Sequence, residues 1–578
     1  MNAKLKTLML KTLVDVCETV KAHQKDDGKI VDNEGRFATG PQAMGYYYAT
    51  LYTYEHPDNP YHHDADILAR AEKCWDYHTG LMNDEGKVAF YTYDQYWSTN
   101  YDTWTTLHLL NSIELLRGHL PGDKLAAYEN KMELAVRGIK ARVDEIYTGE
   151  AYRQNLQKHE LWNIFLWMVA LLTRYALLKD DAALLAYCDG IMNEICAWQL
   201  PFGTWLEGGS LVVAYAHTTL GGLSLYAHYR QNQNTAVNEA VLRNIDYLLA
   251  CYYKGTLPIN CFDIRSRAAK SAGQPFIPGS FVGTPNGLSF CSRHARDLWT
   301  HRAGMTDHLL LLLFFTAGFS TVTEDVAMAP EYPAPDGITY IDKLEQPIES
   351  YSPETLNTLV MRKHGFAVPV CLLTSKSQNE RFHFHRQNLF SVYHEKAGII
   401  IGGGHSTAMP EFSTCNVIAD GLSRYLHTAG KFTGDGRFSL WYGKNRCDIA
   451  IDIGKDAVKV HYQAHFEGEE GEVERVIINV PIFSRHTEFI RAAGPVGEVC
   501  VDTGKLDYCG LRLDPQSIIA TDAADITCDR VATLKYPVFA FNTYMKDQQP
   551  AIENAFMILS CDLDYIRHDM NLVIRMRD

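Results

Sequence analysis

The feature that most restricts the fold of this chain is a change in its hydrophobic pattern near residue 325. Before that point, apolar residues recur every three or four positions, as on the buried face of an amphipathic helix. Short connections carrying Gly, Pro, Asp and Asn separate these stretches. The pattern predicts helices over 4–24, 41–54, 64–81, 102–118, 123–146, 159–179, 183–198, 211–231, 235–253 and 304–317.

After this point the chain favours strands. Short segments alternate between polar and apolar residues or are rich in β-branched residues, and turn residues separate them. Such segments occupy 365–373, 388–394, 398–402, 448–453, 457–462 and 474–480. Many short strands at regular spacing predict an antiparallel sandwich. We expect the end of the chain to continue this pattern as a smaller second sheet layer.

The helix count indicates how the first part closes. About ten to twelve antiparallel helices with short connections commonly form an (α/α) toroid, and a plain bundle or a solenoid is the alternative. The predicted fold class is therefore α+β and multidomain, with an N-terminal (α/α) toroid followed by a C-terminal antiparallel β-sandwich. We predict a helical catalytic domain over 1–325, a proline-containing linker over 326–337 and the sandwich over 338–578.

Composition excludes several classes of partner. The 578 residues exceed one hydrophobic core, and the net charge of −15 argues against nucleic acid. We also expect no membrane association, because no apolar run is long enough to span a bilayer. The N-terminus lacks the features of a signal peptide, which predicts a cytoplasmic protein, or a periplasmic or secreted one if a signal was removed. The 14 cysteines show no C-x-x-C spacing, which favours free thiols.

The most informative motif is the glycine-rich stretch 203–220. It predicts a turn that opens a helix whose first turns carry Tyr215 and His217. A phenol and an imidazole beside a turn can supply the acid and the base for proton transfer next to a carbonyl. The alternative is a tyrosine and a histidine that simply pack in a helical core.

This stretch resembles the heparinase II/III-like polysaccharide lyases, in which a Gly-rich, Glu-containing segment precedes a catalytic tyrosine. The matching residues are 203–208, including Glu207, followed by Tyr215; Phe202 replaces the usual leading Asp. The resemblance implies that Asn163, an amide in an otherwise apolar helix, binds the substrate carboxylate. His159, one turn earlier, takes the part of its usual polar neighbour.

The resemblance also implies that the sandwich contributes a histidine, for which His405 after the glycines 402–404 is our choice. The implied reaction is β-elimination in an acidic, uronic-acid-containing polysaccharide such as a glycosaminoglycan or alginate. Asn163 neutralises the carboxylate, while Tyr215 acts as base and acid. For the other epimer, His217 or His405 is the base.

Further residues are expected to bind the sugar chain. Aromatic and polar side chains alternate over 91–104, as stacking against sugar rings requires. Basic residues near 265 and 293–302 would hold sulfate or carboxylate groups. The predicted substrate-binding residues are His159, Trp97, Asn100, Tyr101, Trp104, Trp205, Glu207, Arg265, Arg293 and Arg296.

No cofactor is expected to be required. His383 and His385 share one face of a predicted strand and are weak candidate ligands for a structural divalent metal. Two other functions fit the sequence. One is a glycoside hydrolase on the same toroid, with Asp102 and Glu207 as its paired carboxylates. The other is a non-catalytic carbohydrate-binding protein.

Overall fold

The computed structural model contains two compact units, which we describe separately. It describes residues 4–265, 276–306, 309–330, 335–342, 357–374, 385–402, 404–466, 473–483, 488–494, 497–541, 550, 552 and 555–577. The helical unit comprises Met1–Trp205, Ala214–Leu249 and Ala272–Tyr332. The β unit comprises Leu206–Val213, Ala250–Ser271 and Pro333–Asp578. Residues 331–334 of the predicted linker lie outside the described residues.

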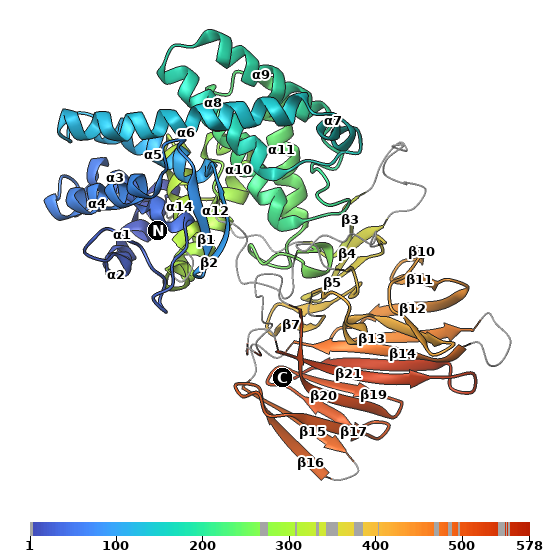
Figure 1. The fold of residues 1–578 in the computed structure, drawn as a ribbon. Helices are drawn as coiled ribbons and strands as arrows, with labels where there is room; N and C mark the ends of the chain where they lie inside the picture. Colours follow the sequence, from blue (N-terminus) through green and yellow to red (C-terminus); the bar gives the residue numbers. More distant parts are fainter. Residues whose placement is uncertain are drawn as a thin grey trace. The chain divides into compact units, whose positions relative to one another are not determined.

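The helical unit is built from α-helices that follow one another along the chain (Figure 1). Among the described residues none of them has the length and apolarity of a membrane span. The helices are α1 Leu5–Asp15, α2 Cys17–His23, α3 Gly45–Thr53, α4 Ala65–Leu81, α5 Thr103–Leu116, α6 Gly122–Thr148, α7 Glu150–Gln157, α8 Asn163–Leu178, α9 Ala182–Ala197, α10 Val213–Tyr229, α11 Thr235–Ala250, α12 Pro285–Thr300, α13 Arg302–Met305 and α14 Leu309–Thr321. Short 3₁₀ turns cover Gly40–Met44, Asn260–Phe262 and Gly279–Phe281.

The sequence pattern located most of these helices and failed in identifiable places. The single helix predicted over 4–24 is two helices, α1 and α2, which meet at Val16. Helix α8 begins at Asn163 and not at 159, because His159 adopts a left-handed backbone (φ 58°) that a helix does not tolerate. Helices α7, α12 and α13 were not predicted.

A β-hairpin lies between the helices predicted over 64–81 and 102–118. Strands β1 (Val88–Thr92) and β2 (Gln95–Asn100) pair in antiparallel fashion around a two-residue turn. Both turn residues, Tyr93 and Asp94, have positive φ, as a type I′ turn requires. The aromatic and β-branched residues here favour strands over helix. The hairpin was not predicted.

The β unit contains two antiparallel sheets. The nine-stranded sheet has the order β10-β11-β12-β13-β22-β19-β18-β15-β16, and the eleven-stranded sheet has the order β17-β20-β21-β14-β7-β6-β5-β4-β3, with β8 and β9 attached at β14. The strands are β3 Gly337–Tyr340, β4 Thr358–Lys363, β5 Phe366–Cys371, β6 Val392–His394, β7 Gly398–Ile401, β8 Cys415–Ala419, β9 Leu422–Arg424, β10 Ala429–Gly434, β11 Arg437–Tyr442, β12 Asn445–Ile453, β13 Ala457–His465, β14 Val473–Ile482, β15 Phe489–Gly494, β16 Gly497–Asp502, β17 Cys509–Leu513, β18 Ile518–Ala520, β19 Ala524–Cys528, β20 Ala532–Phe539, β21 Ala555–Leu563 and β22 Asp569–Met576. A 3₁₀ turn covers Pro410–Phe412.

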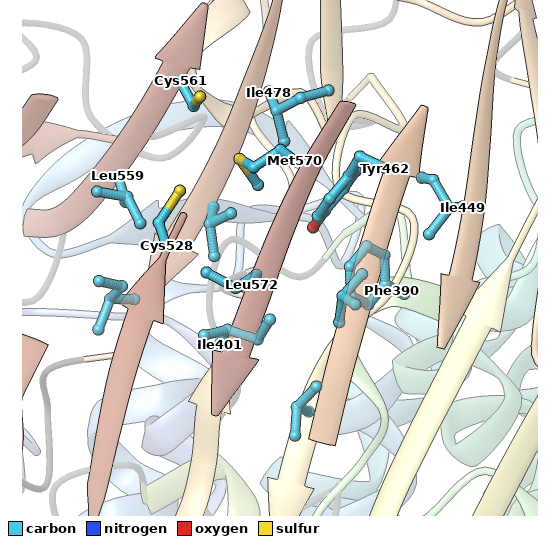
Figure 2. Packing of buried hydrophobic residues seen from close by; sticks show 14 of the residues in the cluster. Phe390, Ile401, Ile449, Tyr462, Ile478, Cys528, Leu559, Cys561, Met570 and Leu572 are labelled. Carbon is cyan, nitrogen blue, oxygen red and sulfur yellow. The ribbon is translucent and has the colours of Figure 1, made fainter. Parts of the chain in front are cut away.

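Alternate residues from both sheets face each other in one core. Ile449, Tyr462 and Leu572 come from the nine-stranded sheet, and Ile478 and Leu559 from the other (Figure 2). Their burial provides the main stabilisation of the sandwich.

The end of the chain does not form a separate layer, contrary to our expectation. Strands β17, β20 and β21 join the eleven-stranded sheet, while β18, β19 and β22 join the nine-stranded one. Strands β18, β19, β20, β21 and β22 have a neighbour on each side, which pairs their backbone groups, whereas β17 is an edge strand of its sheet.

Candidate functional site

The turn at Gly203 is specified by contacts in the helical unit. Gly203 has φ +100°, and a Cβ there would lie 2.0 Å from the carbonyl oxygen of Arg243. The Gly203 carbonyl accepts hydrogen bonds from Asn244 Nδ2 (2.7 Å) and Gln199 Nε2 (3.0 Å). Only glycine fits this close approach to α11. The first glycine of the motif therefore anchors the loop that follows it.

The next part of the motif, Leu206–Val213, belongs to the β unit. Glu207 and Ser210 pair through both backbone hydrogen bonds, and the two residues between them, Gly208 and Gly209, have φ +60° and +71°. Left-handed φ at both central positions is the type I′ geometry that glycine allows without strain. The glutamate of the motif, Glu207, is half-buried at the start of this turn.

The chain then returns to the helical unit and begins α10. Tyr215 is half-buried on its first turn, and His217 is 1% exposed. The ring of His217 contacts Phe290 and His294 of α12, with 5.6 Å between the two imidazole centroids. Burial holds the pKa of His294 well below its ordinary value, and the charges of His217 and Arg293 lower it further. Sequence reasoning did not assign His294, because its spacing from His217 carries no signal.

Asn163 is the first residue of α8 and is buried. The residue before it, Trp162, is 46% exposed. An exposed indole beside a buried amide is a face against which a sugar ring can stack. Trp162 was not among the predicted binding residues, because the exposure of its ring is seen only in the structure.

The helices that carry the predicted residues meet near their N-terminal ends. Trp167 of α8 donates its Nε1–H to the carbonyl of Thr218 at 2.7 Å, one residue beyond His217. Trp104, on the first turn of α5, packs edge-on against Trp167 with 6.4 Å between ring centroids. Both contacts involve the first two turns of these helices, so the starts of α5, α8 and α10 lie near one another. Helix N-termini carry partial positive charge, which favours anions.

His159 and Trp205 have partners that the sequence did not indicate. His159 lies before α8, and its Nδ1 bonds to the carbonyl of Trp198 at 2.8 Å, which leaves Nε2 with the lone pair in the neutral ring. Trp205 is buried, and its indole N–H is donated to the carbonyl of Ile195 at 3.1 Å. This geometry gives Trp205 a packing role and leaves little of its ring exposed; its predicted contact with a sugar stays a prediction.

The aromatic residues over 97–104 differ in their surroundings. Trp97 is half-buried on β2, and the exposed Asn100 donates Nδ2–H to Ser98 Oγ at 2.9 Å. Tyr101 lies against Gly138, where an added Cβ would be 2.0 Å from its ring, so one ring face covers α6. The buried Nε1–H of Trp104 has no hydrogen-bond partner among the described residues.

Asp102, the carboxylate of the hydrolase alternative, is the N-cap of α5. Its Oδ1 accepts the backbone N–H of Trp104 at 3.1 Å, and burial raises its pKa. An N-cap aspartate stabilises the start of its helix, which accounts for this residue without a catalytic role.

The β unit contains a fully buried cation, Arg386, that sequence reasoning did not single out. Its guanidinium donates to Cys261 O (2.6 Å), Ser210 Oγ (2.9 Å), Cys371 Sγ (3.0 Å) and Phe262 O (3.3 Å). These acceptors come from the segments 206–213 and 250–271 and from β5. Arg386 therefore ties both segments to the sandwich.

His405 lies in the same buried cluster. Its Nδ1 accepts the backbone N–H of Gln387 at 3.3 Å, and its Nε2 bonds to the carbonyl of Cys261 at 3.3 Å. The residue is 0% exposed, and burial holds its pKa well below the ordinary value. Both ring nitrogens are engaged with the backbone, a geometry that a structural role for His405 accounts for; its predicted role as a base stays a prediction.

The predicted basic residues belong to both units. Arg296 donates to the carbonyl of Ala329, and Arg293 is half-buried on α12, both in the helical unit. Arg265 is half-buried in the β unit. Of the candidate metal ligands, His383 lies outside the described residues, and His385 Nδ1 accepts the N–H of Ala408 at 3.4 Å. Within the described part of the chain, no group of three or more His, Cys, Asp or Glu could hold a metal.

Comparison with solved structures supplies the fold. The chain is similar to the chondroitin AC lyase of Streptomyces coelicolor A3 in complex with chondroitin sulphate, with a TM-score of 0.50 and 11% identity. The match covers 99% of this chain and 79% of that one. The chain has the chondroitin AC lyase fold. The predicted fold class, an (α/α) toroid followed by an antiparallel β-sandwich, is confirmed.

A second chondroitinase AC lyase, solved in complexes with oligosaccharides, gives a TM-score of 0.43 at 11% identity, covering 99% of this chain and 82% of that one. No protein-family model and no curated protein sequence matches the chain.

Proposed function

We propose that this protein is a polysaccharide lyase that cleaves a uronic-acid-containing polysaccharide by β-elimination. The observation that carries the proposal is the likeness of the whole chain to a chondroitin AC lyase fold. The motif that leads from Gly203 to Tyr215 supports it locally and favours the heparinase II/III-like group. The N-terminal ends of α5, α8 and α10 add positive partial charge where a uronate would be held.

In the proposed reaction Asn163 donates its amide N–H to the uronate carboxylate and stabilises the negative charge that develops there. Tyr215, as the phenolate, removes the C5 proton and then donates it to the departing O4. The C5–H and C4–O4 bonds break, the C4=C5 double bond forms, and no water is consumed. Trp162 stacks against a sugar ring beside Asn163.

In this proposal His217 and His405 do not act as bases, in contrast to our first expectation. His217 and His405 are buried at 1% and 0% exposure, and neither contacts a sugar without a rearrangement. We assign His217, two residues from Tyr215, to positioning the start of α10 against α12. His405 positions the backbone of Cys261. One tyrosine then performs both proton transfers, which suits a syn elimination.

The first test is ultraviolet absorbance during incubation with hyaluronan, chondroitin sulfate, heparan sulfate and alginate. Rising absorbance reports the C4=C5 double bond, and the fastest substrate identifies the preferred polymer. New reducing ends without absorbance would contradict elimination and favour a hydrolase that uses Asp102 and Glu207. Binding without either signal would favour the non-catalytic carbohydrate-binding alternative.

Tyr215→Phe tests the proposed role of the phenol. We expect turnover to fall by at least about a hundredfold, because the variant has no group to exchange a proton with C5 and O4, while substrate affinity changes little. The matched control is Tyr508→Phe, which removes a hydroxyl from a residue that is 77% exposed in the β unit. Full activity in Tyr215→Phe would exclude the proposed mechanism.

A further inference from the structure

The outer face of the eleven-stranded sheet carries a groove with a volume of about 570 Å³. It lies over β14, β20 and β21 and is lined in part by Arg475, Arg512, Arg530, Lys535 and Arg567. None of these residues belongs to the candidate catalytic set. Glu411, Asp562 and Asp564 also line the groove, so its five cations outnumber its three carboxylates in a chain whose net charge is −15.

Strand register shows why polar side chains gather there. Arg512 pairs with Thr533, Thr533 with Ser560, and Ser560 with Asn479. Directly paired residues share a face, and the neighbours Leu511, Leu534 and Leu559 face the core, so this row faces outward. Across four strands the row spans about 14 Å, from a strand spacing of about 4.8 Å.

The neutral members of the row form a connected polar floor. Ser560 donates its Oγ–H to Asn479 Oδ1 at 2.8 Å, and Asn479 donates Nδ2–H to the carbonyl of Pro410 at 3.2 Å. These bonds hold the amide and the hydroxyl in fixed orientations. Groups of this kind match the hydroxyl groups of a saccharide.

The charges in the groove are only partly neutralised. Arg475 pairs with Asp562 at 2.9 Å, and Arg530 pairs with Asp569. Asp564 Oδ1 accepts the backbone N–H groups of Ile566 (2.8 Å) and Arg567 (2.7 Å).

Three cations remain. The side chains of Arg512, Lys535 and Arg567 form no ion pair with any described residue. They are therefore the groups most available to an anion.

We infer that this groove is a second, non-catalytic binding site for an acidic oligosaccharide. Carboxylate or sulfate groups would bind Arg512, Lys535 and Arg567, while sugar hydroxyls would bond to Thr533 and Ser560, whose hydroxyls lie on the floor that Asn479 supports. Nucleic acid fits less well, because no aromatic side chain among the described lining residues offers a base a stacking face. Such a site would retain a long polymer on the protein. The inference rests on the proposed function only for the choice of the polymer used as a probe.

The test compares two triple variants with equal changes in charge. Arg512→Gln/Lys535→Gln/Arg567→Gln removes three cations from the groove. Lys431→Gln/Lys459→Gln/Arg491→Gln removes three exposed cations from the nine-stranded sheet. Affinity for immobilised chondroitin sulfate is measured by biolayer interferometry at low and moderate salt, with neutral dextran as the negative probe.

We expect the groove variant to lose about tenfold or more in affinity, with a weaker salt dependence, and the control variant to lose less than about twofold. Equal affinities of the two variants, or equal binding of dextran, would overturn the inference. As a second measurement on the unmodified protein, chondroitin sulfate should protect Lys535 from acetylation more than it protects Lys459. Equal protection of the two lysines would also overturn it.

This outcome is separable from that of the proposed function. A lyase that lacks the groove site would produce unsaturated product and show equal affinities for the two variants. A groove site on a protein that is not a lyase would show the affinity difference without any rise in absorbance. If both proposals hold, the groove variant keeps its turnover of a short oligosaccharide and loses efficiency only on the long polymer.

Discussion

At the scale of single residues, glycines control the approach to the candidate catalytic tyrosine. Gly203 combines a positive φ with a backbone contact that leaves no room for a side chain. Gly35 also has a positive φ, +78°, but no atom lies within 4 Å of an added Cβ. Comparing alanine variants at the two positions therefore separates the cost of a left-handed alanine backbone from the cost of a steric clash.

Gly203→Ala is expected to lower the free energy of unfolding by about 3 kcal/mol or more, because the alanine is strained and its Cβ clashes with the Arg243 carbonyl. Gly35→Ala is expected to cost only about 1–2 kcal/mol, the cost of the left-handed backbone. Denaturant unfolding of both variants measures the difference. Equal losses would show that the turn at 203 moves away from α11 without cost.

At the scale of elements, α8 and α10, which carry Asn163 and Tyr215, approach each other closely. A Cβ on Gly221 would lie 2.5 Å from Trp167 Cζ2, and a Cβ on Gly222 would lie 2.8 Å from Leu166 Cβ. Small residues let two helices approach closely, and here they also allow the bond from Trp167 to Thr218. The helix crossing therefore depends on two residues that are unfavourable for helix formation.

Gly221→Ala should destabilise the protein by about 1–2 kcal/mol, because the cost of overpacking against Trp167 exceeds the gain in helix propensity. The matched variant is Gly190→Ala in the middle of α9, where nothing lies within 4 Å of the added Cβ. That variant should instead gain about 0.5–1 kcal/mol. Thermal unfolding of both variants measures these changes in stability. A Gly221→Ala variant that is more stable than the unmodified protein would contradict the close crossing of α8 and α10.

At the scale of the whole molecule, buried imidazoles link stability to pH in both units. Burial lowers the pKa of His78 and His427 to about 4 and the pKa of His108 to about 3. In the unfolded chain a histidine titrates near pH 6.5. Between pH 6.5 and about 4 the unfolded chain binds protons that the folded protein does not. The stability is therefore complete above about pH 6.5 and is lost as the pH falls, by up to about 1.4 kcal/mol per pH unit for each imidazole.

We expect the melting temperature to fall steadily from pH 7 to pH 4.5 in calorimetry, before the carboxylates titrate. His108→Phe tests the cause. His108 stacks on Tyr46 with 5.0 Å between ring centroids, and neither of its ring nitrogens has a hydrogen-bond partner among the described residues. Phenylalanine keeps the stacking and removes the titration, so the variant should be more stable and its pH dependence shallower. A melting temperature that is independent of pH over this range would contradict the argument.

Local sequence patterns alone predicted whether most segments form helices or strands, and in what order. Apolar spacing located the helices from α3 to α6 and from α8 to α11, and alternation located β5, β12, β13 and β14. These patterns succeed because a period of 3.6 or 2 is a property of neighbouring residues. The glycine-rich motif pointed to Tyr215 and His217, and the family resemblance pointed to Asn163; the roles of these residues stay predictions.

The contacts that each of these residues makes could be seen only in the folded structure. His217 packs against His294, and Arg386 donates to Ser210, a residue 176 positions away. The folded structure also shows that both ring nitrogens of His405 have backbone partners and that five cations line a groove on the eleven-stranded sheet. Such contacts join segments far apart in the chain, and hydrophobic periodicity carries no information about which distant segment will pack against a given face. Packing therefore decides which residues are buried, which partners they contact and which surfaces they line. The local sequence decides whether a segment forms a helix or a strand.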